Sequence, residues 1–419
     1  MAVGLMIRVL LIAYSNYVRD GRVKRQAEAL AQRGDQVDVI CLADKQLRGG
    51  NGVNTIGVEM PRYHGSNRMG YVHSYLRFFS RAAVIGMRRS RVQRYDAAIV
   101  CSMPDAVVLC VLPLKLFGTR VILDVHDTMP ELYRDKFGGS AGALGARMLM
   151  FEERASAWLA DRVLAVHDLH RIRLESAGIP APKISVVLNS PDPRIFSPSV
   201  NRPPAGDTFT IVCHGTITRR LGLDVAFKAL DMLREQIPCA RLMVIGKGDY
   251  LAQAKASVAA MNLADRVTFM EPVPIEELPA LLRQADVGLV PNLPSAATHL
   301  MLPVKLLEYA TLGIPIIAAR LRTVQHYFGE DAIEFFDGGN PAALATAIAD
   351  VYANPKRRTE LARRASQVAG ALSWGHQRER YFDAIDSLLR PDAIAVIKPE
   401  SGQDAGTHGD GREAALADR

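Results

Sequence analysis

The stretch LPVKLLEYATLGIPIIAA at residues 302–319 predicts a short helix that leads directly into a buried strand. Pro303 suits the first helical turn, where its missing N–H costs no hydrogen bond. Gly313, with a proline two residues later, is expected to end the helix. Lys305 and Glu308 lie one turn apart near the start of this helix, where free N–H groups and the helix dipole favour a phosphate. The alternative interpretation is an ordinary ion pair on a helix surface.

Apolar strands alternate with helices in two separate series along the chain. In the first half the expected strands are residues 7–13, 37–42, 97–101, 121–124, 163–166 and 184–188. In the second half they are residues 209–213, 241–245, 267–269, 287–290, 314–318 and 332–336. This alternation indicates two α/β domains, each built on a parallel, doubly wound sheet. Ligands are then expected at the carboxyl ends of the strands, in a cleft between the domains.

Composition along the chain suggests the domain boundaries. A proline-rich stretch at residues 189–206 is the natural linker. The first domain is therefore expected to span residues 1–195 and the second residues 196–373. An amphipathic helix at residues 374–390 follows. The tail at residues 391–419 is rich in Gly, Asp and Ala and has no aromatic residue, so it is expected to be disordered.

The overall composition is typical of a globular protein. The 419 residues are 49% hydrophobic and 23% charged, which suits two domains with separate cores. No apolar run reaches the roughly 18 residues that a transmembrane helix needs, and the apolar N-terminal segment reads as a strand rather than a signal peptide. The five cysteines are scattered and include no Cys-x-x-Cys pair. We therefore expect a reduced, cytoplasmic protein without a structural zinc.

Positive charge is concentrated in the first half of the chain. Residues 1–195 contain 27 Lys and Arg against 18 Asp and Glu, a net charge of +9, whereas the remainder has 24 against 26, a net charge of −2. The basic half is expected to face an acidic partner such as phospholipid, nucleic acid or a phosphorylated acceptor. Nothing resembles a nucleic-acid-binding motif, so no nucleic-acid partner is expected.

Two glycine-containing loops follow expected strands of the second domain. The sequence HGTITRRLGLD at residues 214–224 places Gly215 where a ligand can approach the backbone, and Arg219 and Arg220 can neutralise a diphosphate. The alternative is a solvated turn with two surface arginines. The later sequence IGKGD contains Gly246 in a Gly-x-Gly pattern, which is weak evidence for a nucleotide site and equally consistent with a tight strand–helix turn.

Two loops of the first domain carry acids and histidines. The sequence DVHDTMPE, which begins at Asp124, puts His126 and Asp127 at the end of a strand, where they could bind a metal or supply a general base. Their spacing matches no zinc pattern, and a structural histidine is the alternative. The sequence HDLH at residues 167–170 also looks metal-like, but Asp168 is expected to cap a helix there, and we assign it no chemistry.

An arginine-rich segment of the first domain lies between Pro61 and Tyr95. It contains eight arginines, among them Arg77, Arg81 and Arg88, and no acidic residue. From about residue 71 it reads as a helix whose apolar residues share one face: Val72, Tyr75, Leu76, Phe79 and Ala83. A basic, amphipathic helix of this kind is typical of the interface of an anionic membrane. The alternative is that the apolar face packs on the domain's own sheet and leaves a solvated basic edge.

The stretch at residues 302–319 resembles the nucleotide-sugar site of family 4 glycosyltransferases. The resemblance is to the subset of the family in which this site has the motif Pro-x-Lys-x-x-Glu-Tyr. The sequence at residues 214–224 resembles the His-Gly-Thr form of the same family. The resemblance covers residues 6–390 and implies a GT-B fold, in which two Rossmann-like domains face each other across a cleft. It places the acceptor in the first domain and a nucleoside-diphosphate sugar in the second, and it implies that the helix at residues 374–390 crosses back onto the first domain. It implies a retaining, metal-independent transferase of the hexosyl or N-acetylhexosaminyl type, with no cofactor.

The resemblance also implies roles for individual residues. Glu308 would hold the nucleotide ribose, while Lys305 and Arg220 would stabilise the departing diphosphate, with Arg219 as the substitute for Arg220. His126 would touch the transferred sugar. The remaining donor contacts are assigned to Gly215, Thr216, Gly246, Pro303 and Val304. The acceptor and membrane side is assigned to Asp127, Arg77, Arg81 and Arg88.

This chain departs from the family pattern at two positions. Leu221 stands where a basic residue often contacts phosphate, so that role moves to Arg220, and Leu300 stands where a first acid often precedes Glu308 by eight residues. These departures motivate one alternative, a catalytically weak partner subunit. A sugar-nucleotide epimerase of the same architecture is another. No two aspartates are separated by a single residue, so cations and a helix dipole, rather than Mg²⁺ or Mn²⁺, would stabilise the leaving group.

Two further expectations concern the first domain. In the family, the loop after the first strand, here residues 20–25, meets the diphosphate and acceptor. A capped helix with a basic first turn explains the same residues equally well. The basic segment leads us to expect a lipid-linked or membrane-proximal acceptor, in polysaccharide or glycolipid assembly. The protein would then lie peripherally at the inner face of the cytoplasmic membrane.

Overall fold

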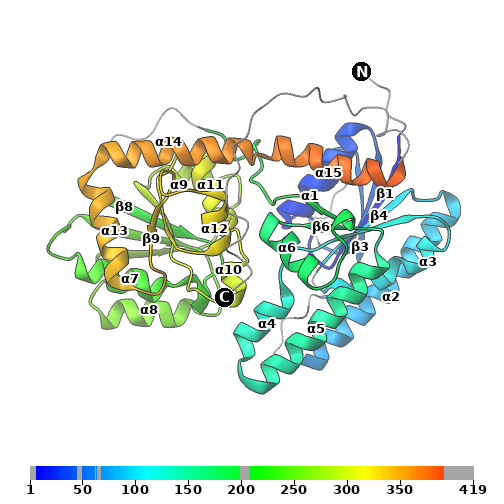
Figure 1. The fold of residues 1–419 in the computed structure, drawn as a ribbon, viewed down its shortest axis with the longest axis horizontal. Coiled ribbons are helices and arrows are strands. Elements are labelled where there is room, and N and C mark those ends of the chain that lie inside the picture. Colours follow the sequence, from blue (N-terminus) through cyan, green and yellow to red (C-terminus); the bar gives the residue numbers. More distant parts are fainter. Residues whose placement is uncertain are drawn as a thin grey trace, which may run out of the picture.

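The computed structural model describes residues 6–44, 50–61, 63, 68–102, 104–198 and 207–390. It contains two parallel sheets, one in each half of the chain (Figure 1). The expected fold of two Rossmann-like, doubly wound domains is therefore confirmed. The expected disordered tail at residues 391–419 and the second part of the expected linker, residues 199–206, lie outside the described residues.

The first sheet has seven strands in the order β3-β2-β1-β4-β5-β6-β7. Their bounds are β1 (Arg8–Ala13), β2 (Gln36–Leu42), β3 (Val53–Val58), β4 (Ala97–Cys101), β5 (Arg120–Asp124), β6 (Arg162–Ala165) and β7 (Ile184–Val186). Strand β3 is not predicted from the sequence, because Asn54, Thr55 and Gly57 interrupt its apolar residues. It pairs only with β2 and forms an edge of the sheet, where such residues are tolerated.

Helices cover both faces of the first sheet. Its core residues divide into two apolar clusters, one on each face. One face carries α1 (Gly21–Arg33) and α15 (Trp374–Leu389). The other face carries α2 (Arg68–Val92), η1 (Asp105–Val111), α3 (Leu112–Lys115), α5 (Gly139–Leu159) and α6 (Asp168–Ser176). The short η2 (Ala181–Lys183) precedes β7 and buries no residue. Helix α4 (Met129–Phe137) pairs with α5 beyond the end of β5.

The second sheet has six strands in the order β10-β9-β8-β11-β12-β13. Their bounds are β8 (Phe209–His214), β9 (Ala240–Ile245), β10 (Val267–Met270), β11 (Val287–Val290), β12 (Ile316–Ala319) and β13 (Glu334–Phe336). The connecting helices are η3 (Arg219–Leu221), α7 (Leu223–Met232), α8 (Leu251–Ala260), α9 (Leu278–Leu282), α10 (Ala296–His299), α11 (Val304–Thr311), α12 (Arg322–Tyr327), α13 (Pro341–Ala353) and α14 (Pro355–Ala371). One continuous apolar cluster forms its core.

The carboxyl edges of the two sheets face each other. The backbone N–H of Asp168, just after β6, donates to the Tyr327 hydroxyl at the end of α12, 2.9 Å away. The carboxylate of Asp135 in α4 accepts from the backbone N–H of Ala297 in α10 at 3.2 Å. All of these residues follow the carboxyl ends of strands, so the loops that carry candidate ligand-binding residues in the two domains are opposed.

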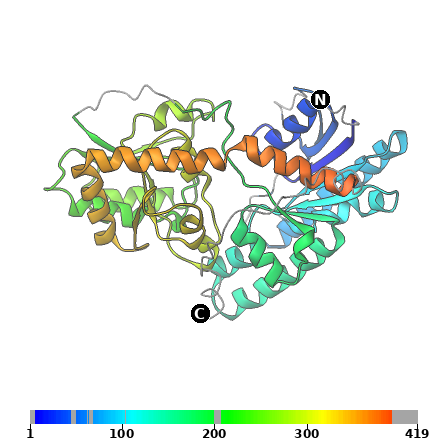
Figure 2. The same ribbon diagram turned by 45° about the horizontal axis from the view of Figure 1, so that its top comes forward.

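Helix α15 packs on the first sheet although it follows the second domain in sequence. Helices α14 and α15 run one after the other along both domains (Figure 1, Figure 2). The guanidinium of Arg33 in α1 binds the carboxylate of Asp386 at 3.0 Å. The side chain of Gln377 accepts from the backbone N–H of Leu188 at 3.1 Å. The guanidinium of Arg25 lies over the ring of Trp374, with its central carbon 4.7 Å from the ring centroid.

The predicted apolar face of α2 is only partly correct. Phe79 is buried against the sheet and Tyr75 is half-buried, together with Phe78, which lies outside the predicted face. Val72 and Leu76 are instead 48% and 60% exposed. Helix α2 therefore packs on its own sheet through one row of side chains and still leaves apolar side chains in solvent. No helix of the described residues combines the length and hydropathy required to cross a bilayer.

Candidate functional site

Helix α11 begins without a side-chain cap at the carboxyl edge of the second sheet. Pro303 is its N-cap residue and supplies no hydrogen bond to the first turn. Gly313 has a φ of +71°, and its left-handed backbone lets the chain leave the helix and enter β12 at Ile316. The helix-to-strand prediction from this stretch is confirmed. Val304 and Lys305 contribute free N–H groups at the positive end of the helix dipole.

Glu308 is held by a histidine and does not form the surface ion pair of the alternative interpretation. Its carboxylate is buried, and Oε2 lies 2.6 Å from Nε2 of His214, at the end of β8. Since an ionised carboxylate can only accept, the imidazole Nε2–H donates. The other ring nitrogen lies 2.8 Å from the hydroxyl of Tyr309. This chain of contacts fixes the orientation of Glu308 and leaves Oε1 without a partner among the described residues.

Lys305 lies beside Gly215 with its ammonium group unpaired among the residues that the structure describes. A Cβ at Gly215 would lie 3.8 Å from Lys305 Nζ, and the φ of Gly215 is +118°. Burial lowers the pKa of Lys305, and the charge of Arg220 lowers it further, while Cys213 and Glu308 oppose the shift. The site therefore gathers positive charge that no carboxylate of the described part of the chain neutralises by direct contact, which is an arrangement suited to an anionic ligand.

The two arginines of η3 are exposed next to this cation. Arg219 and Arg220 both point away from the core and make no side-chain hydrogen bond that the described residues record. Arg220 is the one close enough to Lys305 to affect its pKa. Its backbone carbonyl accepts from the N–H of Leu293 at 2.9 Å, which fastens the loop after β8 to the loop after β11. Thr216 is exposed in the same loop.

Gly246 brings two loops into backbone contact. Its φ is +149°, and a Cβ there would lie 2.0 Å from the carbonyl oxygen of Gly215. The Gly-x-Gly pattern thus permits the loop after β9 to press against the loop after β8. This geometry matches the tight-turn alternative, and it also shapes the surface beside Lys305. Pro303 is buried at the base of this surface and Val304 is half-buried.

In the first domain, His126 is anchored by a buried aspartate. Its Nε2 lies 3.2 Å from the carboxylate of Asp124, and its backbone N–H donates to the Ser102 hydroxyl at 2.8 Å. The His126 side chain is 17% exposed. Although burial alone would raise the pKa of Asp124, the charges of Arg22 and His126 hold it well below its usual range. Asp127 is half-buried beside this pair.

The cluster around Asp124 is better satisfied as a hydrogen-bond network than as a metal site. Cys101, Asp124 and His126 place one ligand atom each within 4.8 Å of one another. Both carboxylate oxygens already accept, one from Arg22 and the other from Gln26 and His126. Burial and the nearby Asp124 charge raise the pKa of Cys101 well above its ordinary value, which keeps the thiol protonated.

The loop after β1 forms a capped helix with buried arginines. The Asp20 carboxylate accepts from the N–H of Val23 at 3.1 Å and caps α1. Arg22 forms its ion pair with Asp124, and Arg25 donates to Asn189 at 2.8 Å. These side chains are buried and bound inside the first domain. The capped-helix alternative therefore describes residues 20–25.

The expected cap at Asp168 is wrong, because His167 takes that position. His167 is the N-cap residue of α6, and its Nδ1 accepts from the N–H of His170 at 2.9 Å. Its Nε2 lies 3.0 Å from the carbonyl oxygen of Leu300 in the second domain, to which it donates. Burial lowers the pKa of His167 to about 4. Asp168 is instead the first helical residue and accepts from the Tyr327 hydroxyl at 2.7 Å.

The three arginines assigned to the membrane side differ in their surroundings. Arg77 and Arg88 are exposed on α2. Arg81 is half-buried and donates to the carbonyl of Glu59 at 2.7 Å. Arg89, on the same helix, pairs with Asp38 at 3.4 Å. The helix thus keeps part of its positive charge free for an external partner.

Sequence reasoning missed His214 and Tyr309 as members of the site. Both belong to the quoted motifs, but their contacts join residues 94 and 95 positions apart. A buried acid on an otherwise apolar helix indicates in the sequence that such a contact exists, because the buried carboxylate requires a partner from elsewhere in the fold. His214, which ends the first strand of the same domain, was the obvious candidate for that partner.

Comparison with known families gives two matches that together cover most of the chain. A family model described as "Glycosyl transferases group 1" matches residues 199–368. A model described as "Glycosyl transferase 4-like domain" matches residues 21–190. The first match contains Lys305, Glu308 and His214, and the second contains His126.

Curated relatives match over part of their length. The GDP-mannose-dependent alpha-(1-6)-phosphatidylinositol monomannoside mannosyltransferase of Mycolicibacterium smegmatis is 29% identical over 208 residues, which cover 47% of this chain and 54% of the relative. The amylovoran biosynthesis glycosyltransferase AmsK of Erwinia amylovora is 31% identical over 158 residues, 38% of this chain and 39% of the relative. The chain therefore spans about half or less of the length of these relatives.

Solved structures share the fold across nearly the whole chain. Sucrose-phosphate synthase from Thermosynechococcus elongatus has a TM-score of 0.75 at 18% identity, covering 93% of this chain and 100% of that chain. Anabaena Alr3699/HepE, in complex with UDP, has a TM-score of 0.67 at 14% identity, covering 91% of this chain and 100% of that chain. At these identities the likeness concerns the fold.

Proposed function

Since this chain belongs to the family of glycosyl transferases group 1, we propose that it transfers a sugar from a nucleoside-diphosphate sugar to an acceptor. One observation carries the proposal. The ammonium of Lys305 and Oε1 of Glu308, neither of which has a partner among the residues that the structure describes, lie within one turn of each other at the uncapped N-terminus of α11. A diphosphate needs the cation and the helix terminus, and a ribose hydroxyl needs the carboxylate oxygen.

The reaction requires negative charge to be stabilised as the sugar leaves the diphosphate. Breaking the bond between the anomeric carbon and the diphosphate oxygen places charge on that oxygen. We assign the stabilisation of this charge to Lys305, Arg220 and the free N–H groups of α11, which would lower the barrier without a metal ion. Arg219 is the substitute if Arg220 does not make this contact. Transfer with retention of the anomeric configuration is part of the proposal.

Orientation of the donor depends on the His214 contact. Because His214 donates to Oε2 of Glu308, the carboxylate cannot rotate freely, and Oε1 keeps one direction. A positioned acceptor oxygen binds a hydroxyl with less loss of side-chain entropy than a mobile one. We assign the remaining donor contacts to the loop surface formed by Gly215, Thr216, Gly246, Pro303 and Val304.

The acceptor and the transferred sugar are assigned to the first domain. His126 lies at the carboxyl edge of the first sheet, which faces the second domain, and Asp124 fixes its ring. We propose that His126 contacts the sugar and that Asp127 lies on the acceptor side. The sugar is of the hexosyl or N-acetylhexosaminyl type.

We place the acceptor on a lipid or near a membrane, in polysaccharide or glycolipid assembly. The name of the Mycolicibacterium relative contains phosphatidylinositol monomannoside, and that of the Erwinia relative contains amylovoran biosynthesis. The exposed Arg77 and Arg88 of α2 suit an anionic surface. Peripheral attachment at the inner face of the cytoplasmic membrane follows from this assignment.

A panel experiment tests the donor assignment. Purified protein is heated with nucleoside diphosphates and their sugars, and the melting temperature is followed. We expect one nucleotide to stabilise the wild type and to have less effect on Lys305→Ala. Stabilisation by no nucleotide, or equal stabilisation of both proteins, contradicts the assignment.

Product analysis distinguishes the two alternatives. An epimerase converts the nucleotide sugar when no acceptor is present, whereas a transferase requires an acceptor to form its product. A partner subunit binds the nucleotide sugar without turning it over. Turnover that depends on an added lipid or saccharide acceptor supports the proposal against both.

A further inference from the structure

Helix α5 exposes a row of large apolar side chains to solvent. Leu144, Met148, Phe151 and Trp158 are 62%, 67%, 76% and 78% exposed. Their spacing of four, three and seven residues places them on one side of the helix. Single exposed apolar residues are normal, but a continuous row along one helix marks an interaction surface. We call these four residues the α5 row.

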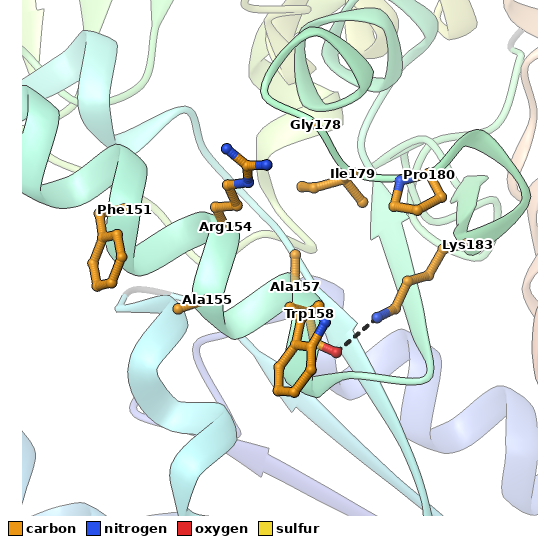
Figure 3. A pocket seen from close by; sticks show the side chains of 9 residues that line it. All are labelled: Phe151, Arg154, Ala155, Ala157, Trp158, Gly178, Ile179, Pro180 and Lys183. Atoms are coloured by element: carbon orange, nitrogen blue, oxygen red, sulfur yellow. Dashed lines mark hydrogen bonds between the residues drawn. The ribbon is translucent and has the colours of Figure 1, made fainter.

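A hollow lies at the C-terminal end of the α5 row. It has a volume of about 580 Å³, and its lining includes Trp158, Ile179, Pro180 and two cations, Arg154 and Lys183 (Figure 3). The Lys183 ammonium donates to the backbone carbonyl of Trp158 at 2.8 Å, which keeps the cation beside the indole. Apolar walls with cations at their edge match a ligand that is both apolar and anionic.

The acidic residues of α5 point inward, away from the α5 row. Glu153 is buried and pairs with Arg173, and the carboxylate of Glu152 accepts from the backbone N–H of Ala106. Arg147 and Arg154 are exposed on the outer side. The outer surface of the helix therefore combines apolar side chains with positive charge.

The basic helix α2 belongs to the same layer of the domain. Helices α2 and α5 both cover the face of the first sheet opposite α1 and α15, and η1 contacts both of them (Figure 1). Arg77 and Arg88 are exposed on α2, as are the apolar Val72 and Leu76. Because the sequence from Pro61 to Tyr95 contains no acid, every charged side chain of α2 is basic.

We propose that the α5 row docks on the surface of an anionic lipid bilayer, with Phe151 and Trp158 inserted at the level of the headgroups. Apolar side chains flanked by arginines on one helix face are the features that interfacial binding requires, and Trp favours the boundary between headgroups and acyl chains. A second copy of this chain is a poorer occupant, because a symmetric contact would place the exposed arginines of α5 in one copy against those in the other.

This docking deepens the proposed function, on which its biological purpose rests. The N-terminal end of α5 adjoins α4, whose Asp135 contacts the second domain at the carboxyl edges of the sheets. The 21 residues of α5 span about 31 Å. A bilayer along α5 would therefore extend to the region where the acceptor is expected, and a lipid-linked acceptor would need only a short path.

Vesicle co-sedimentation with a matched pair of variants tests the proposal. The vesicles are phosphatidylcholine with or without phosphatidylglycerol, and the variants are Met148→Glu and Met232→Glu. Met232 is 60% exposed on α7 of the second domain, so it matches Met148 in chemistry and exposure. We expect the wild type and Met232→Glu to bind the anionic vesicles, and Met148→Glu to bind about tenfold or more weakly. Equal binding by the two variants, or no binding by the wild type, overturns the proposal.

Tryptophan quenching gives a readout that does not depend on a destabilising charge. The chain has two tryptophans, and Trp374 is buried at 7% exposure. Lipids brominated on their acyl chains are expected to quench the emission of the wild type but not that of Trp158→Phe. Absence of quenching in the wild type contradicts insertion of Trp158.

Two controls separate docking from self-association and from nucleotide binding. Light scattering without vesicles reports self-association, and a dimer that Met148→Glu dissociates would make the α5 row a contact between copies and overturn the proposal. Nucleoside-diphosphate binding by every variant reports the proposed function separately. Vesicle binding without nucleotide binding supports the docking and contradicts the transferase assignment. Nucleotide binding without vesicle binding supports the transferase assignment and contradicts the docking.

Discussion

His167 should make the stability of this protein depend on pH in a defined range. In the folded state its Nδ1 accepts from the N–H of His170 and its Nε2 donates to the carbonyl of Leu300. Both bonds require the neutral ring, because a second proton on Nδ1 would remove the acceptor that caps α6. Burial lowers the pKa of His167 from 6.5 to about 4.

The direction and size of the pH effect on stability follow from the linkage between proton binding and folding. A group whose folded-state pKa is lowered binds a proton more readily in the unfolded state. Its contribution to stability is therefore complete above pH 6.5 and is lost as the pH falls toward 4. A tenfold change in proton affinity between the folded and unfolded states corresponds to about 1.4 kcal/mol, so His167 can contribute up to about 3 kcal/mol. His170 is also buried, and the pKa of His170 is lowered well below its usual value by burial and by the charges of His167 and Arg173.

The assay is urea unfolding of the wild type and His167→Asn across this pH range. Asparagine keeps a side-chain acceptor at the N-cap position but does not titrate. We expect the wild type to lose more stability than His167→Asn on acidification, by up to about 3 kcal/mol. His170 is present in both proteins, so the cost of charging its buried ring enters both profiles, and their difference reports His167 together with the effect of its charge on His170. His73→Asn, at an exposed position on α2, serves as the control and should follow the wild type. Parallel pH profiles of the wild type and His167→Asn would refute the reasoning.

Further predictions concern the donor site. His214→Phe removes the donor that orients Glu308, so it should weaken nucleoside-diphosphate binding roughly tenfold or more, since a hydrogen bond to a charged group contributes about 1.5–3 kcal/mol; calorimetry that gives an unchanged Kd contradicts this role. Arg220→Ala should lower kcat more than Arg219→Ala, because Arg220 is the arginine whose charge acts on Lys305; the opposite order assigns the diphosphate contact to Arg219. Transfer should be insensitive to EDTA, and activity lost on chelation and restored by Mg²⁺ or Mn²⁺ would show that cationic side chains alone do not stabilise the leaving group.

Local signals in the sequence predicted most of the fold. Helix α1 runs from Gly21 to Arg33 because Asp20 caps its start and Gly34 adopts a left-handed conformation at its end, and both residue types are typical of these positions. Pro303 precedes α11 as an N-cap residue without a side-chain cap, and Gly313 turns the chain out of the helix with a left-handed backbone. Strand β3 could not be recognised, because its polar residues are tolerated only by virtue of its edge position, which is a property of the assembled sheet.

The site was less predictable, because its contacts join distant residues. The motif containing Glu308 indicated a ligand, but only the fold shows that His214 holds the carboxylate from another strand. His167 was passed over as a cap because an imidazole nitrogen is a less common cap acceptor than a carboxylate. The α5 row was missed for a related reason. Apolar residues at helical spacing normally face the core, and only the packed structure reveals that Phe151 and Trp158 face solvent.

The central claim is that Glu308 and Lys305 hold the nucleotide sugar, and the steady-state rate of sugar transfer by Glu308→Ala and Lys305→Ala tests it most directly. Glu276→Ala and Lys228→Ala, at exposed positions of the same domain, are the matched controls. We predict that each site variant stays folded and loses roughly tenfold or more in kcat/KM, since a charge-assisted hydrogen bond contributes about 1.5–3 kcal/mol, while the controls keep wild-type rates. Near wild-type transfer by a folded Glu308→Ala protein would contradict the claim.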